Sequence, residues 1–205
     1  AVTDSFTITV ANTNDAPTVA TIIADASTAE DALYSVDISG NFADVDVGDT
    51  LTYAATGMPS TMSMSSAGVL SGTPLNADVG THNVVVTATD SATPAGSVSD
   101  TFVVTVTNTN DAPTISSTAV LAATEDAGYT YTVTTSDVDT GDGITMAGTT
   151  VPSWLSFDVS TGVLAGTPLN ADVGDHAVVI TATDTAGAAV TDSFTITVAN
   201  TNDAP

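Results

Sequence analysis

The residues of this sequence that could do chemistry are carboxylates set in short loops that occur twice. Two stretches, "ADVDVGD" and "SDVDTGD", each place acidic residues around one glycine: Asp44, Asp46 and Asp49, then Asp137, Asp139 and Asp142. Carboxylates at alternate positions can aim at one ion from an irregular loop, and oxygen ligands with a glycine in the loop suit Ca²⁺. The chain has no Cys, and neither His lies among these residues, which argues against zinc. The alternative is a set of solvated turn residues, because Asp is common in turns.

Further acidic and amide side chains recur in the same register. The only two Glu residues, Glu30 in "TAED" and Glu125 in "ATED", occupy equivalent positions, as do Asp90 and Asp184 at the ends of two "TATD" stretches. The motif "NTNDAP" occurs three times and supplies Asn12, Asn14 and Asp15, then Asn108, Asn110 and Asp111, then Asn200, Asn202 and Asp203. This repetition favours ion binding over scattered turn residues.

The charge balance restricts the partners. The chain has 24 acidic residues, no Lys or Arg, and a formal net charge of −24. Such a chain lacks the cations that phosphate binding needs, so nucleic acid is excluded as a partner. It also disfavours anionic membrane surfaces, and no apolar run is long enough for direct membrane insertion. The counter-charge must come from metal ions or salt.

The elements that must position these residues read as β-strands. Segments such as "DSFTITV" and "HAVVITATD" alternate polar and apolar residues, and Gly, Pro, Asn and Asp punctuate them every few residues. About seven short strands per repeat predict an immunoglobulin-like β-sandwich. In "VPSWLSFD", Trp154, Leu155 and Phe157 should fill the core of the second sandwich, and Met62 and Met64 should fill the same space in the first.

The repeats define the expected domains. We expect the final strand and linker of a preceding repeat at 1–16, one sandwich at 17–112 and a second at 113–205, as in an extended rod. Residues 1–17 and 189–205 are identical, which indicates a segment of a longer tandem array. An isolated strand is not stable alone. Residues 2–10 should therefore pair with a neighbouring repeat or with a second copy, with Phe6, Ile8 and Val10 facing a core outside this chain.

These motifs together resemble the cadherin repeat, and more closely the dystroglycan-type cadherin-like and "putative Ig" repeats of large bacterial surface proteins. The resemblance covers both repeats and implies calcium ions at the junctions of successive sandwiches. For the middle junction it implies ligands from both repeats and the linker: Glu30, Asn76, Asp78, Asn108, Asn110, Asp111, Asp137, Asp139, Asp184 and Asp142. For the upstream junction it implies Asn12, Asn14, Asp15, Asp44, Asp46 and Asp90. For the downstream junction it implies Glu125, Asn170, Asp172, Asn200, Asn202 and Asp203.

Two departures from the family weaken the implied sites. Cadherins have Asp where this chain has Asn12, Asn108 and Asn200, and D-R-E where it has "NAD" at 76–78 and 170–172. Fewer charged ligands imply weaker binding or fewer ions, and we expect two or three ions at the middle junction.

The sequence does not favour catalysis. His82 and His176 lie at the start of equivalent strands, which predicts a repeated structural role. Glycoside hydrolysis needs one carboxyl group of a pair to be protonated, whereas calcium would keep both ionised. The expected function is a calcium-stiffened spacer of an extracellular adhesin, biofilm matrix protein or filament, secreted or at the cell surface. The alternative is a carbohydrate-binding module that uses Tyr34, Tyr53, Tyr129 or Tyr131 on a polysaccharide.

Overall fold

The chain is all-β in a computed structural model that describes residues 1–202. It divides into two units, Ala1–Thr109 and Asn110–Pro205, which are described separately below. The all-β class predicted from the alternating residues is confirmed. Along the long strand of each unit, every second side chain is buried, as in Val84, Val86 and Ala88, because one face of the strand lies on the core.

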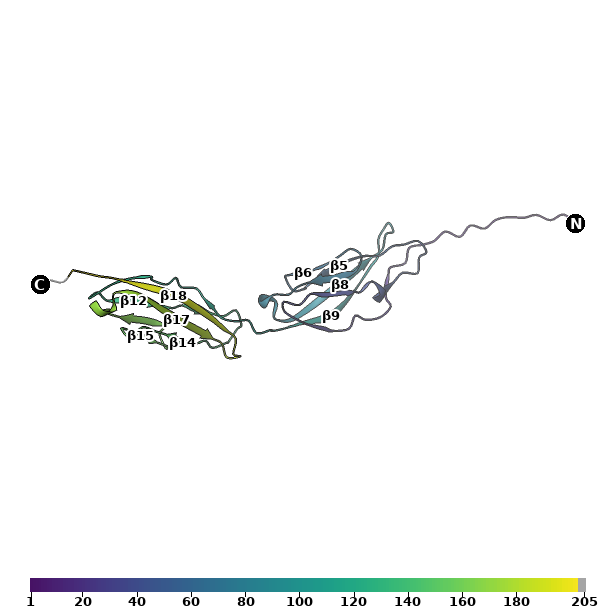
Figure 1. Cartoon of the computed structure of the whole chain (residues 1–205). Coiled ribbons are helices and arrows are strands. Elements are labelled where there is room, and N and C mark those ends of the chain that lie inside the picture. The colour runs from purple at the N-terminus through teal and green to yellow at the C-terminus, as the bar shows by residue number, and fades with distance from the viewer. Residues whose placement is uncertain (203–205) are drawn as a thin grey trace. The chain divides into compact units, whose positions relative to one another are not determined.

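Unit 1 contains two main sheets (Figure 1). Its elements are β1 (Thr18–Val19), β2 (Ala26–Ala29), β3 (Tyr34–Asp37), η1 (Ser39–Asn41), β4 (Phe42–Ala43), β5 (Thr52–Thr56), β6 (Met62–Met64), β7 (Val69–Gly72), η2 (Asn76–Asp78), β8 (Gly80–Thr89) and β9 (Ser97–Thr107), of which η1 and η2 are 3-10 helices. One sheet has the order β2-β9-β8-β5 and the other the order β3-β7-β6, while β1 pairs with β4. Strand β2 is parallel to β9, and the other pairs in these sheets are antiparallel.

Unit 2 repeats this order of elements. They are β10 (Thr114–Ile115), β11 (Ala122–Thr124), β12 (Tyr129–Thr132), β13 (Thr135–Ser136), β14 (Thr145–Thr150), β15 (Leu155–Asp158), β16 (Val163–Gly166), the 3-10 helix η3 (Asn170–Asp172), β17 (Gly174–Thr183) and β18 (Ala189–Ala199). The sheets have the orders β11-β18-β17-β14 and β12-β16-β15, and β10 pairs with β13. The last strand, β18, therefore lies between a parallel neighbour, β11, and an antiparallel one, β17.

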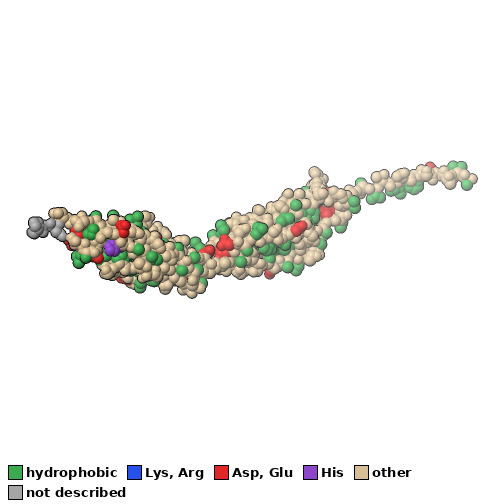
Figure 2. Space-filling model, in the orientation of Figure 1, with side chains coloured by type: hydrophobic (Ala, Val, Ile, Leu, Met, Phe, Trp, Pro, Cys, Tyr) green, Lys and Arg blue, Asp and Glu red, His purple; other side chains and the backbone are tan. Residues whose placement is uncertain are grey.

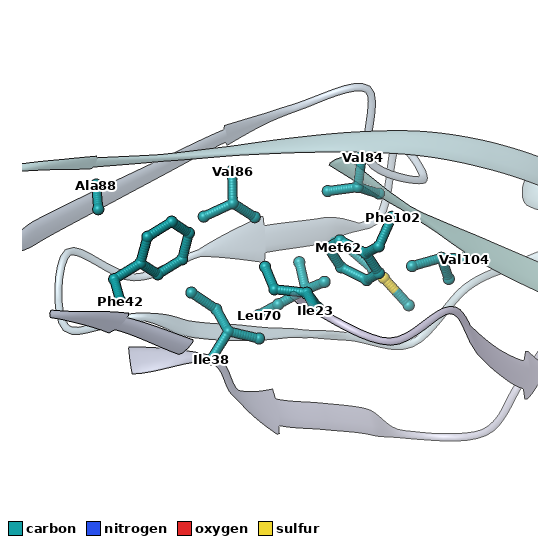
Figure 3. Close-up of a cluster of buried hydrophobic side chains, with 10 residues drawn as sticks. All are labelled: Ile23, Ile38, Phe42, Met62, Leu70, Val84, Val86, Ala88, Phe102 and Val104. Carbon is teal, nitrogen blue, oxygen red and sulfur yellow. The ribbon is translucent and has the colours of Figure 1, made fainter. Parts of the chain in front are cut away.

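The core of unit 1 is formed by side chains from both main sheets (Figure 3). Leu70 from one sheet and Val84 and Val86 from the other are fully buried. Burial of each such side chain contributes about 1.5–3 kcal/mol. Met62 is buried and Met64 packs against this cluster, so the prediction that both fill the core is confirmed.

The core of unit 2 uses bulkier residues at the corresponding place. Leu155 is buried, and Trp154 and Phe157 pack against the cluster, as predicted. The Trp154 ring makes edge contacts with Tyr129 at 5.8 Å and with His176 at 5.9 Å between ring centroids. Trp154 is therefore a core residue, and it is also the only Trp in the sequence.

The segment before unit 1's first strand has no secondary structure. No strand forms among residues 1–16, and residues 1–13 are all exposed (Figures 1 and 2). The exposed fractions are 82% for Phe6, 74% for Ile8 and 88% for Val10. The structure thus does not form the strand predicted at 2–10, and an isolated strand is not stable alone. Its contact with a neighbouring repeat or copy stays a prediction.

Candidate metal centre

A tight loop turns the "ADVDVGD" stretch back on itself in unit 1. Asp44 follows β4, and its Oδ1 accepts a hydrogen bond from the backbone N–H of Asp46 at 2.9 Å. Gly48 has a φ of 102°, a left-handed conformation that favours glycine. The N–H of Asp49 then donates to the carbonyl oxygen of Asp46 at 3.3 Å. The D-x-D-x-G-D pattern therefore encodes the turn that returns Asp49 toward Asp44.

The turn completes a group of carboxylates. Oxygens of Asp44, Asp49 and Asp90 all lie within 4.8 Å of one another. Asp90 follows β8, is 5% exposed, and accepts backbone N–H groups of Ala92 and Gly96 at 3.1 and 3.0 Å. No Lys or Arg exists to neutralise these charges. The three carboxylates repel one another unless bound protons or cations neutralise part of their charge.

Residues 12–15 are tied to this loop by hydrogen bonds within unit 1. Asn12 Nδ2 and the N–H of Asp15 donate to the two carboxylate oxygens of Asp46, both at 2.7 Å. Asn14 Nδ2 donates to Asp90 Oδ2 at 3.1 Å. The N–H of Asp15, together with the Asn12 amide, lowers the pKa of Asp46 below its usual value. Asp46, predicted as a ligand, thus holds the segment that precedes β1.

Unit 2 contains the same arrangement. Oxygens of Asp137, Asp142 and Asp184 lie within 4.8 Å of one another, and Gly141 has a φ of 96°. Asn110 Nδ2 donates to Asp184 Oδ2 at 2.9 Å. That amide, with backbone N–H groups after Asp184, lowers the pKa of the Asp184 carboxyl.

The linker bond on the second loop is also repeated. The N–H of Asp111 donates to Asp139 Oδ2 at 2.7 Å, as Asp15 does to Asp46. The two repeats therefore form the same arrangement of linker and loop residues.

The two Glu residues are buried at the ends of β2 and β11. Glu30 and Glu125 are each 2% exposed. Glu30 Oε1 accepts the N–H of Thr109 at 2.8 Å, and Glu125 Oε1 accepts the N–H of Thr201 at 2.6 Å. The Oε2 atom of each is buried without a hydrogen-bond partner. A buried carboxylate oxygen in this state costs free energy unless a cation or donor meets it.

The residue after each Glu has an unusual backbone. Asp31 and Asp126 both have a φ of 58°, in the left-handed region that costs a residue with a side chain about 1 kcal/mol or more. Their N–H groups donate to the carbonyl oxygens of Pro74 and Pro168, each at 2.8 Å. The two units therefore share this backbone conformation after the buried Glu.

The "NAD" helices hold predicted ligands in a different role. Asp78 is 3% exposed and accepts hydrogen bonds from the N–H and Oγ of Ser60, from Thr61 Oγ1 and from the N–H of Leu75. Burial alone would raise its pKa, but these donors outweigh burial and lower the pKa to about 2. In unit 2, Asp172 Oδ2 accepts the N–H of Leu169 at 2.9 Å. Among the described residues neither Asp belongs to a group of three carboxylates, and Asn76 and Asn170 lie in the same 3-10 turns.

Four of the remaining predicted ligands belong to the "NTNDAP" linkers. Asn108 and Asn200 are exposed, and Asn200 Nδ2 donates to the carbonyl oxygen of Thr201 at 3.0 Å. Asn202 is exposed as well, and Asp203 lies outside the described residues. The sequence-based ligand set omitted Asp49, although its counterpart Asp142 was included. The shared register of the two loops was the signal that would have added it.

The histidines and aromatic residues have structural roles. His82 Nε2 lies 2.8 Å from the carbonyl oxygen of Asp78, and His176 Nε2 lies 2.6 Å from that of Asp172. Because a carbonyl oxygen only accepts, Nε2 carries the proton in both residues. The repeated structural role predicted for the histidines is confirmed.

The tyrosines do not form an exposed stacking surface. Tyr129 and Tyr131 are 6% and 5% exposed, and their hydroxyls bond to Val120 and Ser117. Tyr34 and Tyr53 are partly buried and pack against the core of unit 1. A sugar-stacking role needs an exposed ring face, which the buried Tyr129 and Tyr131 do not offer.

Comparison with known proteins is consistent with this geometry. A family model described as "Putative Ig domain" matches residues 16–107 and 112–199. The "Serine-rich adhesin for platelets" of Staphylococcus aureus is 30% identical over 146 residues, or 71% of this chain. The chain spans only 6% of that adhesin, and 10% of the adhesin of strain MRSA252 at the same identity.

One of two similar solved structures supports the fold. Mouse cadherin-23 domains EC22–24 match at 17% identity with a TM-score of 0.50, over 92% of this chain and 67% of that one. An endo-fucoidan hydrolase of glycoside hydrolase family 107 reaches a TM-score of 0.42 at 25% identity, over 91% of this chain and 29% of the enzyme. The predicted resemblance to cadherin-like repeats is confirmed at the level of the fold. No helix in residues 1–202 is long and apolar enough to span a membrane.

Proposed function

Since the chain belongs to the "Putative Ig domain" family, with two successive copies of the domain, we propose that it is a calcium-stiffened spacer of an extracellular adhesin. Its work is mechanical: it extends and orients other parts of a surface or matrix protein. It has no chemistry of its own in this proposal. The likeness to adhesin repeats supports this setting, and the site geometry supports the ion.

The observation that carries the proposal is a set of buried oxygens without donors. In the described part of the chain, six buried side-chain atoms lack a hydrogen-bond partner. Five are oxygens of predicted ligands: Asn14 Oδ1, Glu30 Oε2, Asp44 Oδ2, Glu125 Oε2 and Asp137 Oδ2. Buried polar atoms are normally satisfied. Buried oxygens without hydrogen-bond donors beside several carboxylates are suited to binding a hard cation.

The residues present fit calcium. In unit 1 we assign Asp44, Asp49 and Asp90 as the charged ligands, joined by Asn14. Carboxylate and amide oxygens in a flexible loop are what Ca²⁺ prefers, and Mg²⁺ demands stricter octahedral geometry. When bound, the ion would supply the positive charge that the sequence lacks. The protein's own residues form the loop, orient the ligand oxygens and make the hydrogen bonds to residues 12–15.

In unit 2 the equivalent ligands are Asp137, Asp142 and Asp184. Asn110 and Asp111 are bonded to this loop, and Thr109 is bonded to Glu30 in unit 1. Ions that fix these residues would limit the bending of the linker at 108–113. This is how calcium would stiffen a string of repeats.

Neighbouring repeats or copies of the same protein are the proposed partners. The exposed segment at 2–10 is the proposed point of contact, because Phe6, Ile8 and Val10 are apolar and have no core in this chain. Adhesion to a host or a biofilm matrix would then belong to other parts of the full protein. The carbohydrate-binding alternative finds no support in the aromatic residues, since Tyr129, Tyr131 and Trp154 belong to the core of unit 2.

The test is a calcium titration that follows Trp154, which reports on unit 2 alone. Extracellular modules bind calcium at about 10⁻⁴–10⁻³ M. An ion bound only by the folded state stabilises it by about 2.7 kcal/mol at a hundredfold excess over Kd. We expect a calcium-dependent rise in the Trp154 melting temperature. Replacement Asp137→Asn should weaken binding about tenfold, which corresponds to about 1.4 kcal/mol.

The matched control is Asp175→Asn, which removes the same charge from unit 2. Asp175 is exposed on β17 and accepts one hydrogen bond from Thr197 Oγ1, away from the carboxylate group. It should retain the calcium response of the unmodified chain. If calcium leaves the Trp154 transition unchanged, or if both variants lose the response equally, the proposed site is wrong.

A further inference from the structure

The carboxylate loop of unit 2 ends in a dipeptide with a reactivity of its own. Asp142 is followed by Gly143, and this is the only Asp-Gly pair in the sequence. The backbone nitrogen that follows an Asp can attack the side-chain carboxyl carbon, because the product is a five-membered succinimide ring. Glycine hinders this attack least, since it has no Cβ and the widest choice of backbone angles.

The structure leaves the attacking nitrogen without a hydrogen bond. Gly143 is exposed and lies between the turn at Gly141 and the start of β14. Among residues 1–202, no acceptor is hydrogen-bonded to the N–H of Gly143. Thr185 Oγ1 donates to Asp142 Oδ1 at 2.8 Å. A donor at this oxygen would stabilise the negative charge that develops on it during the attack.

Unit 1 has the same loop with its nitrogen held in place. Asp49 is followed by Thr50, whose N–H donates to Ser91 Oγ at 3.1 Å. The same hydroxyl donates to Asp49 Oδ1, also at 3.1 Å. The nitrogen of Thr50 must give up its hydrogen bond before it can turn toward the carboxyl carbon. Unit 1 therefore provides an unreactive reference within the same chain.

We propose that Asp142–Gly143 is a site of spontaneous backbone isomerisation. The Gly143 nitrogen forms a bond to Asp142 Cγ, and the N–H proton leaves with the hydroxyl of the protonated carboxyl group as water. A second water then adds to one of the two carbonyl carbons of the succinimide. Opening of the bond between the nitrogen and the main-chain carbonyl carbon of Asp142 gives isoaspartate, and opening at Cγ restores Asp142. Water is the only other reactant.

The product would change the carboxylate group without changing its charge. In isoaspartate the chain runs through Cγ, and the remaining carboxylate is attached directly to Cα, one methylene shorter. The oxygens that lie within 4.8 Å of those of Asp137 and Asp184 would be displaced. This consequence deepens the proposed function, on which it rests, whereas the isomerisation itself does not require calcium. An ion held by the Asp142 carboxylate would occupy the oxygen that must leave, so calcium should slow the reaction.

The experiment ages the whole chain at neutral pH, below its melting temperature, in calcium and in chelator at equal ionic strength. Isoaspartate is counted by methyl transfer with protein isoaspartate methyltransferase, and it is located by electron-transfer fragmentation of peptides. We expect isoaspartate to accumulate at position 142 and to exceed that at position 49 at every time point. Its accumulation should be faster in chelator than in calcium.

Gly143→Ala is the matched variant, because it keeps every carboxylate. The backbone at Gly143 is not in the left-handed region, and a Cβ there would meet Thr185 Cγ2 at 3.5 Å, an ordinary contact. The variant should melt like the unmodified chain when fresh and should lose most of the isoaspartate at position 142. Thr50→Gly in unit 1 should have the opposite effect and raise the isoaspartate at position 49.

Two results would overturn the proposal. They are no more isoaspartate at position 142 than at position 49, and equal accumulation in the Gly143→Ala chain. Equal rates in calcium and in chelator would leave the modification site standing and would contradict Asp142 as an ion ligand. A calcium response of Trp154 without isoaspartate at position 142 would remove this inference alone. After ageing in chelator, the unmodified chain should lose part of its calcium response, and the Gly143→Ala chain should retain it.

Discussion

At the scale of single residues, the acidic side chains divide into two roles that composition alone does not separate. Asp44 and Asp137 keep one buried oxygen without a donor, which fits an ion. Asp78 has its carboxylate covered by protein donors, which fits a structural residue. Both kinds were predicted as ligands because both repeat in register. Repetition in register identifies candidate residues. The number of hydrogen-bond donors around each oxygen then separates a candidate metal ligand from a structural hydrogen-bond acceptor.

Asp78 gives a pH prediction for unit 1. Its folded pKa is about 2, below the unfolded value of about 3.9. Its stabilisation is therefore fully present above about pH 4 and is lost as the pH falls toward 2. Replacement Asp78→Asn should lower the urea midpoint of unit 1 at pH 7. The difference from the unmodified chain should shrink between pH 4 and 2, and a difference that stays constant over this range would contradict the assignment.

At the scale of elements, strands were predictable because their alternation is a local property of the sequence. The Val- and Thr-rich stretches at β8, β9, β17 and β18 show it clearly. Short pairs such as β1 with β4 have two residues each and carry no such pattern. The parallel pairing of β2 with β9 joins segments far apart in the chain, so no local signal reveals it.

The same limit applies to the site. The turn at Gly48 was readable from its residue type, but the approach of Asp90 to Asp44 depends on how β4 and β8 meet. The polar bonds of Asp46 to residues 12–15 were also out of reach, because they require the folded loop. The sequence therefore indicated that carboxylates recur at these loops, but it did not indicate which of them lie together.

Close packing in the smaller sheet of unit 2 gives an element-scale prediction. Gly166 in β16 pairs with Leu155 and Tyr129, and a Cβ there would overlap the carbonyl oxygen of Trp154. Overpacking of this kind costs about 1–3 kcal/mol, so Gly166→Ala should lower the stability of unit 2 by that amount in chemical unfolding followed by Trp154.

Gly128 offers the matched control for that change. A Cβ at Gly128 would meet no atom within 4 Å. Gly128→Ala should therefore change stability by less than about 0.5 kcal/mol, as is usual for surface positions. Equal losses in the two variants would show that the close approach in β16 is not the cause.

At the scale of the whole molecule, charge and repetition point to one design. A chain with a net charge of −24 and no cations repels itself, and each repeat adds more of the same charge. Figure 2 shows acidic side chains on both units and no basic ones. In the proposed function, cations at the carboxylate groups would reduce this repulsion, and the stiffness of successive repeats would then depend on the calcium concentration.

The most direct test of this account is small-angle X-ray scattering of the whole chain, first in millimolar calcium and then after chelation at constant ionic strength. The account predicts that calcium narrows the range of conformations of the linker at 108–113. The profile in calcium should fit one arrangement of the two units, and the profile in chelator should require an ensemble. Profiles that superimpose under the two conditions would contradict the calcium-stiffened spacer.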